Sequence, residues 1–130
     1  MISGIDHFVL TVRSLEATLD FYERTLGMRR ELVPNRPASL RFGTQKINVH
    51  QADRTFEPKA RHATEGAGDF CLVTDEPIDT VLAHLAAQHV PIEAGPIARN
   101  GARGQMTSIY FRDPDGNLVE VSHYPSAAAT

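Results

Sequence analysis

The amino-acid sequence predicts an α+β fold made of two successive βαβββ modules. The length of 130 residues leaves room for one domain of the usual size, and 42% apolar with 22% charged residues is an ordinary globular composition. The order of predicted strands and helices is the same in both halves of the chain. Because a repeated order indicates a repeated architecture, we assign a first module to about residues 4–51, a linker to 52–68 and a second module to about 69–124.

The first module begins with residues 5–12 (IDHFVLTV), whose β-branched and apolar side chains predict a buried strand. Ser14 is a suitable N-cap for the helix that follows, in which apolar residues recur at helical spacing. Gly27 stands where a C′ glycine ends such a helix. Three short strands complete the module, at residues 29–33, 38–42 and 46–51.

The second module repeats this order after the linker. Residues 69–74 (DFCLVT) predict a strand, and Asp75 can cap a helix that has Pro77 in its first turn. The last two strands are joined by a strong turn sequence, DPDG at residues 113–116. The three strands of this half are expected near residues 91–98, 106–112 and 117–122.

Charge and cysteine content exclude several classes of partner. The net charge is −3 and the isoelectric point is near 6.0, so no basic surface is expected to bind nucleic acid or anionic lipid. The single cysteine cannot form an internal disulfide, and no apolar stretch is long enough to span a bilayer. The patterned strand starts at residue 5, which leaves no room for a signal peptide. A cytoplasmic location is therefore expected.

Four polar residues share the sheet face that turns away from the helices. Because strand side chains alternate, the apolar set of each module fixes which residues face its helix. The opposite face carries His7 and His50 in the first module, and Asp69 and Glu120 at the matching positions of the second. Taken singly, each has a structural explanation: a hydrogen-bonded histidine, a cap at a strand entry or an ion pair with a nearby basic residue.

Taken together, the four residues predict a divalent metal site. Charged groups in the middle of a strand are costly to bury unless they are paired or metal-bound. Two imidazoles and two carboxylates form a mixed nitrogen and oxygen set, which suits Zn²⁺, Ni²⁺, Co²⁺, Mn²⁺ or Fe²⁺ better than Ca²⁺. The expected cofactor is therefore a divalent metal ion, and the ligand types do not choose among these five.

The same face is expected to carry four substrate-binding residues: Arg41, Asn48, Ser108 and Tyr110. Arg41 is the candidate for contact with an anionic substrate group such as a carboxylate, and the alternative is a surface arginine on an edge strand. Cys71 is expected to be a small buried filler rather than a nucleophile. The glycine-rich, basic loop at residues 99–104 is either a mobile lid or an ordinary hairpin loop.

Three segments of this pattern resemble the vicinal oxygen chelate superfamily, which includes glyoxalase I, extradiol dioxygenases and bleomycin-binding proteins. They are IDHFVLTVRSLEATLDFYERTLGM at the start, RFGTQKINVHQ in the middle and SIYFRDPDGNLVEVSHY at the end, so the resemblance covers nearly all of residues 4–124. It implies that residues 1–130 are one glyoxalase-like domain, in which the two βαβββ modules form a cup-shaped mixed sheet with the helices on the outside.

The resemblance also implies a ligand set and an assembly. His7, His50 and Glu120 are expected to bind the cation, with Asp69 as a fourth ligand or a nearby base. The distribution of histidines and carboxylates over these positions differs from the usual one in glyoxalase I and in the dioxygenases, which leaves the substrate class open. A homodimer is expected, in which each site takes its two histidines from one subunit and its two carboxylates from the partner.

The expected function is that of a metal-dependent, glyoxalase-like lyase or isomerase. The cation would hold adjacent oxygens of a small, anionic substrate and stabilise an enediolate, while Glu120, or else Asp69, moves the proton as the catalytic carboxylate. One alternative is an extradiol-type dioxygenase with non-haem Fe²⁺, since two histidines and one carboxylate form its ligand set. An alternative of another class is a metal-free drug-binding protein, which would need aromatic side chains on this face, and the chain contains no tryptophan.

Overall fold

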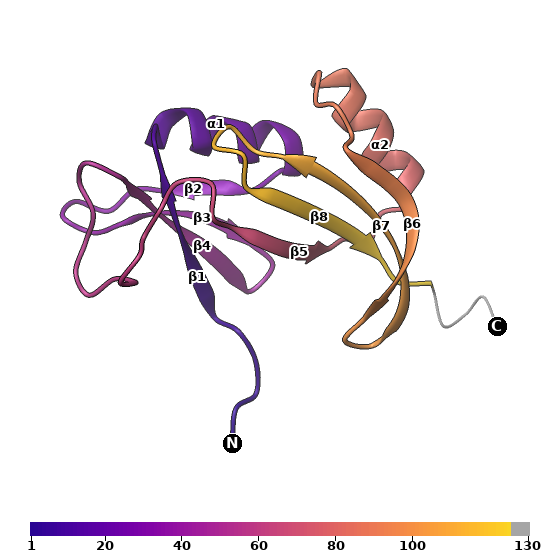
Figure 1. Ribbon diagram of the computed structural model, residues 1–130, viewed down its shortest axis with the longest axis horizontal. Helices are drawn as coiled ribbons and strands as arrows, with labels where there is room; N and C mark the ends of the chain where they lie inside the picture. The colour runs from indigo at the N-terminus through magenta and orange to yellow at the C-terminus, as the bar shows by residue number, and fades with distance from the viewer. Residues whose placement is uncertain (126–130) are drawn as a thin grey trace. The chain divides into compact units, whose positions relative to one another are not determined.

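The computed structural model describes residues 1–125. Its elements follow in the order β1 (His7–Val12), α1 (Leu15–Leu26), β2 (Arg29–Glu31), β3 (Ala38–Phe42), β4 (Gln45–Gln51), β5 (Asp69–Val73), α2 (Ile78–Ala87), β6 (Ala94–Gly101), β7 (Gly104–Arg112) and β8 (Leu118–His123). This is the order βαβββ twice, which confirms the predicted α+β fold (Figure 1). No helix within residues 1–125 is long and apolar enough to cross a membrane.

The first compact unit comprises residues 1–68 and 114–117. Its strands form one sheet in the order β1-β4-β3-β2, with β1 parallel to β4 and the other neighbours antiparallel. The helix α1 contacts β2, β3 and β4. The core lies between the helix and the sheet, and its central side chains are at most 4% exposed: Leu10, Leu19, Tyr22, Leu40, Ile47 and Val49.

Helix α1 begins and ends at the residues that the sequence predicts. The Ser14 hydroxyl accepts a hydrogen bond of 3.2 Å from the backbone N–H of Ala17, which satisfies one of the free donors of the first turn. Gly27 adopts the left-handed conformation with φ of 69°, and its N–H donates to the carbonyl of Glu23. Glycine enters this region without steric penalty, so the chain can leave the helix here and start β2.

The second compact unit comprises Asp69–Asp113 and the chain from Leu118 onward. Its sheet has the order β5-β8-β7-β6, with β5 parallel to β8, so the topology of the first unit is repeated strand for strand. The helix α2 contacts β7. Its core is formed by side chains that are at most 7% exposed: Ile78, Leu85, Ile109, Phe111, Val119 and Val121.

The start of α2 differs from the prediction, because Asp75 is not its N-cap. The cap is Pro77, with an extended ψ of 144° and no side-chain hydrogen bond to the first turn. A residue that precedes proline is disfavoured in the helical region, so Glu76 cannot be the first helical residue after a cap at Asp75. Instead the hydroxyl of Thr74 accepts a hydrogen bond of 3.0 Å from the backbone N–H of Glu76, and this local turn leads into the helix.

The basic segment at residues 99–104 is part of an ordinary hairpin rather than a lid. Strand β6 continues to Gly101 and β7 starts at Gly104, and these two glycines pair directly with each other. The hairpin is fixed to the end of β8, because the Tyr124 hydroxyl accepts a hydrogen bond of 3.2 Å from the backbone N–H of Arg103. The guanidinium of Arg103 also lies over the Tyr124 ring, 4.3 Å from its centre.

Candidate functional site

The pairing of β1 with β4 determines which polar residues share a face in the first unit. His7 pairs with Lys46, two residues further on Val9 pairs with Asn48, and Thr11 pairs with His50. Because alternate residues point to the same side, His7, Asn48 and His50 lie on one face, opposite the apolar residues that pack on α1.

The second unit has the same pairing between β5 and β8. Asp69 pairs with Leu118, Cys71 pairs with Glu120, and Val73 pairs with Ser122. Asp69 and Glu120 therefore lie on one face and two residues apart along neighbouring strands, a separation of about 7 Å. This is close enough for both carboxylates to approach one ion.

Comparison of the two registers corrects one expected match. Counted from the first residue of β1 and of β5, His7 corresponds to Asp69, and Asn48 rather than His50 corresponds to Glu120. The expected match of His50 with Glu120 is wrong by two residues. A shift of two residues keeps every side chain on its own face, so the apolar alternation could not detect the error.

The register also separates the two histidines of the first unit. His7 and His50 stand four residues apart along the strands, which is about 13 Å at the usual rise per residue. A ring nitrogen must come within about 2.1 Å of a metal ion to bind it. Two histidines whose backbones stand this far apart do not both reach one ion, although both line one cavity of the first unit.

His7 has a carboxylate beside one of its ring nitrogens. Its Nδ1 lies 2.8 Å from Oδ1 of Asp6, and the side chain of His7 is 42% exposed. The hydrogen bond to His7 lowers the pKa of the Asp6 carboxyl below its usual value, so the partner of the imidazole stays ionised. A carboxylate on one ring nitrogen fixes the tautomer and leaves Nε2 available as a ligand.

His50 has a different environment. The residue is 4% exposed, and its ring centre lies 5.5 Å from that of Phe56. Burial, helped by the nearby Lys59 ammonium, lowers the pKa of His50, so the imidazole is held in its neutral form. Its Nδ1 is buried and has no hydrogen-bond partner within residues 1–125.

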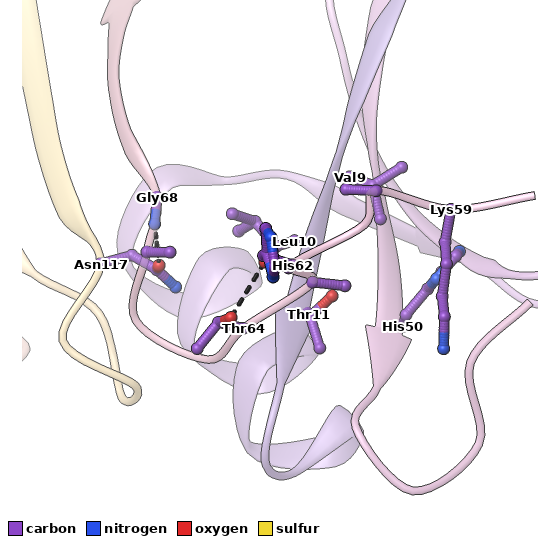
Figure 2. A pocket seen from close by; sticks show the side chains of 12 residues that line it. Val9, Leu10, Thr11, His50, Lys59, His62, Thr64, Gly68 and Asn117 are labelled. Atoms are coloured by element: carbon purple, nitrogen blue, oxygen red, sulfur yellow. Dashed lines mark hydrogen bonds between the residues drawn. The ribbon is translucent and has the colours of Figure 1, made fainter.

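His50 lines two cavities of the first unit. The smaller has a volume of about 180 Å³ and lies between β1 and the linker, where the Asn117 side chain accepts a hydrogen bond of 2.7 Å from the backbone N–H of Gly68 (Figure 2). The larger has a volume of about 620 Å³ and also includes His7 and Asn48. The polar face of this sheet is therefore the lining of a cavity.

Glu120 is held by a chain of hydroxyl groups in the second unit. The Ser122 hydroxyl donates to Oε2 of Glu120 at 3.2 Å. A hydroxyl has one hydrogen to give, so Ser122 Oγ accepts from Ser108 Oγ at 2.6 Å. Cys71 Sγ, which also lies 3.9 Å from the carbonyl oxygen of Leu72, is 3.1 Å from Ser122 Oγ. Sequence analysis missed Ser122, although it stands two residues after Glu120 on the same strand and hence on the same face.

All four of the expected substrate-binding residues already have ionic or hydrogen-bonding partners, and that of Ser108 is the Ser122 hydroxyl. The Arg41 guanidinium donates two hydrogen bonds to the Glu31 carboxylate, at 2.8 and 3.0 Å, so its charge is largely balanced. The Tyr110 hydroxyl accepts a hydrogen bond of 2.9 Å from Nε of Arg99. Asn48 Oδ1 accepts one of 3.3 Å from the Ser39 hydroxyl, which leaves the amide NH₂ of Asn48 to serve as a donor.

The expected ligands are divided between the two units. His7 and His50 belong to the first, and Asp69 and Glu120 belong to the second. Within residues 1–125, no three His, Cys, Asp or Glu side chains gather as a metal site. Cys71 is exposed, so it is not the buried filler that the sequence predicts. Its thiol takes part in the hydroxyl chain, and partial desolvation raises the pKa of the thiol, which is unfavourable for a nucleophile.

Comparison with known proteins gives consistent matches over nearly the whole chain. The chain is 45% identical over 124 residues to the virulence protein STM3117 of Salmonella typhimurium, a match that covers 95% of this chain and 86% of that protein. The crystal structure of that protein has a TM-score of 0.93 over 96% of this chain and 99% of its own.

Two further relatives extend the comparison. The glyoxalase domain-containing protein RDO1 of Mycosarcoma maydis is 41% identical over 126 residues, 97% of this chain and 71% of that protein. The crystal structure of a lactoylglutathione lyase from Agrobacterium tumefaciens has a TM-score of 0.72 with 27% identity over 94% of each chain.

A family model covers most of the chain as well. It is described as the Glyoxalase/Bleomycin resistance protein/Dioxygenase superfamily, and it matches residues 4–121. Together with the repeated βαβββ order and the relatives above, this match confirms the resemblance that the sequence indicates: the chain belongs to the Glyoxalase/Bleomycin resistance protein/Dioxygenase superfamily.

Proposed function

We propose that this chain is a metal-dependent lyase or isomerase of the glyoxalase type, acting on a small molecule with adjacent oxygens. The cation would be held by His7 of one first module and by Asp69 and Glu120 of one second module, which come from the same chain or from two chains of a homodimer. The observation that carries the proposal is the pairing of His7 Nδ1 with Asp6 at 2.8 Å, which prepares Nε2 to act as a ligand.

The donor set fits a divalent cation of the first transition row. One imidazole and two carboxylates provide nitrogen and oxygen ligands, and such a set suits Zn²⁺, Ni²⁺, Co²⁺, Mn²⁺ or Fe²⁺. Asp69 and Glu120 share a face at about 7 Å along their strands, so both can turn toward one ion. When bound, the cation supplies Lewis-acid polarisation of a substrate oxygen.

Within this set, Glu120 is also the candidate base. Its Oε2 is fixed by the Ser122 hydroxyl, which leaves Oε1 as the atom that can take a proton from carbon next to a carbonyl group. Asp69 is the second candidate, because it lies on the same face. Arg41 could bind a substrate carboxylate only by exchanging its two hydrogen bonds to Glu31.

The separation of His7 and His50 favours a glyoxalase-type reaction over a dioxygenase reaction. A non-haem iron dioxygenase of this type needs two histidines and one carboxylate on the metal. His7 and His50 are about 13 Å apart along their strands, so they do not supply that pair. The similarity to a lactoylglutathione lyase at 27% identity also supports a lyase or isomerase reaction.

The test uses untagged protein, stripped with a chelator and then reloaded with each metal. We expect about one ion per chain and metal-dependent isomerisation of the methylglyoxal–glutathione hemithioacetal or a larger analogue. Glu120→Gln should abolish turnover, while His84→Gln, a change at an exposed histidine on α2, should leave both metal content and turnover unchanged. Oxygen consumption with catechols would support the dioxygenase instead. Failure of the wild-type protein to retain any metal would favour a metal-free binding protein.

A further inference from the structure

Two buried side-chain polar atoms within residues 1–125 have no hydrogen-bond partner, and one of them is Nδ1 of His50. Buried polar groups in folded proteins are nearly always satisfied, so an exception on the wall of a cavity requires an explanation. The ring is 4% exposed and packs beside Phe56, so its position is fixed rather than free to turn toward solvent.

The unsatisfied nitrogen indicates where the proton of the neutral ring resides. If His50 bound a cation through Nε2, Nδ1 would have to carry the proton, and a buried N–H would be left without an acceptor. With the proton on Nε2, Nδ1 is only an unused acceptor, which is the more tolerable of the two states. His7 shows the contrast, since its Nδ1 has the Asp6 carboxylate that metal-binding histidines usually have.

Of the two cavities that His50 lines, the larger is the one that it shares with His7. Its volume is about 620 Å³, and its polar lining consists of six residues: His7, Asn35, Arg36, Asn48, His50 and Glu57. The apolar lining consists of one valine, one phenylalanine and three prolines: Val9, Pro34, Pro37, Phe56 and Pro58. A molecule that fits here has apolar surface and carries an oxygen acceptor where it meets His50.

The positions of the two histidines in this cavity also indicate how long its ligand must be. His7 and His50 line it about 13 Å apart along the strands, as counted from their register. A molecule that reaches from a cation on His7 to His50 therefore needs two oxygen-bearing ends with an apolar segment between them. A three-carbon compound is too short to make both contacts.

We propose that His50 is not a metal ligand but a specificity residue, whose Nε2–H donates a hydrogen bond to a carbonyl or carboxylate oxygen at the end of the substrate remote from the cation. The substrate class is then a two-ended acid or ketone with adjacent oxygens at one end. The inference rests on the proposed function for the end that a cation holds, whereas the contact with His50 depends on the first unit alone.

The experiment uses a homologous series of 2-oxo-dicarboxylates as probes: 2-oxoglutarate, 2-oxoadipate and 2-oxosuberate. Each has adjacent oxygens at one end and a carboxylate at the other, with a methylene chain of increasing length. Binding to the Co²⁺-loaded protein is measured by calorimetry. In the wild type, we expect the affinity to rise with the length of the methylene chain. In His50→Phe this gain should be lost, so that 2-oxosuberate binds about tenfold more weakly than it binds to the wild type. Affinity that is independent of chain length in the wild type would overturn the inference.

Two variants separate the hydrogen bond from packing. His50→Phe keeps an aromatic ring beside Phe56 but removes the donor, and His50→Gln restores an N–H near the position of Nε2 and should recover part of the gain. Thermal unfolding confirms that each variant is folded. Equal binding of 2-oxosuberate by the wild type and His50→Phe would overturn the inference, as would failure of His50→Gln to bind better than His50→Phe.

Metal titration distinguishes this inference from the proposed function. Both His50 variants should bind Co²⁺ as the wild type does, and a large loss of Co²⁺ affinity in both would make His50 a ligand and overturn the inference. If the wild type binds no cation, the proposed function fails. The contact with His50 is then tested on the metal-free protein with suberate, a dicarboxylate that lacks the adjacent oxygens. Weaker suberate binding by His50→Phe would then still support the contact with His50, and equal binding would overturn it.

Discussion

Replacing Ser122 by alanine tests the hydroxyl chain that holds Glu120. The Ser122 side chain is fully buried, and its oxygen lies 2.6 Å from Ser108 Oγ, 3.1 Å from Cys71 Sγ and 3.2 Å from Glu120 Oε2. Ser122→Ala leaves the buried Ser108 hydroxyl without this acceptor and releases one oxygen of Glu120. A buried polar group that loses its partner destabilises a protein by about 1–3 kcal/mol, which corresponds to roughly 4–12 °C in Tm for a domain of this size.

The assay combines thermal and urea unfolding with a second variant. Because replacing both partners of a buried hydrogen bond removes the unsatisfied group, the double variant Ser108→Ala, Ser122→Ala should be destabilised by less than the sum of the single variants, with a coupling of about 1 kcal/mol. Ser3→Ala, at an exposed serine, is the matched control and should unfold as the wild type does. The hydroxyl chain would be refuted by additive effects of the two substitutions. A loss of unfolding free energy below about 0.5 kcal/mol in Ser122→Ala would also refute it.

Three further predictions follow from two glycines and from the titratable groups of His50 and Cys71. Gly95→Ala should be severely destabilising, because φ is +99° and the added Cβ would overlap the carbonyl oxygen of Ser108. Gly27→Ala meets open space and should lower the free energy of unfolding by only about 1 kcal/mol. Equal losses of unfolding free energy in the two variants would contradict this prediction. The pKa of His50 is lowered on folding, so the unfolded chain binds the proton more tightly and stability should fall as pH drops below about 6.5. Urea unfolding of His50→Phe between pH 5 and 8 should lack this component. Because burial raises the pKa of Cys71, iodoacetamide should alkylate it at pH 8 more slowly than it alkylates a free thiol, and a faster reaction would show that the thiol is activated.

Much of the fold could be predicted because local patterns determine it. The apolar spacing of α1 with Ser14 before it and Gly27 after it is a purely local signal, and the structure has both caps where the sequence places them. The start of α2 was missed for an equally local reason, namely the conformational restriction on Glu76 before Pro77. The repeat of element order was sufficient to predict the two βαβββ modules, whereas the structure has two four-stranded sheets in place of the one cup-shaped sheet that the resemblance implies.

The candidate site could be predicted less completely because it depends on strand pairing. The alternation of apolar and polar residues identifies the sheet face that carries His7, His50, Asp69 and Glu120. It cannot distinguish two strand registers that differ by two residues, because both place the same side chains on that face. Only the paired strands show that Asn48 stands where Glu120 stands in the other module. The partners of side chains on different strands, such as Glu31 for Arg41, are likewise set by pairing and not by spacing along the chain.

The central claim is that His7, oriented by Asp6, is the imidazole ligand of a divalent cation. Its most direct test is the equilibrium affinity for Zn²⁺ of the wild type, His7→Gln and Asp6→Asn, measured by competition with a chromophoric chelator. We expect the wild type to bind about one ion per chain and His7→Gln to lose nearly all of this affinity. Asp6→Asn should bind about 10–100-fold more weakly, since partners of metal-bound histidines contribute to that extent. Equal affinity in all three proteins would contradict it.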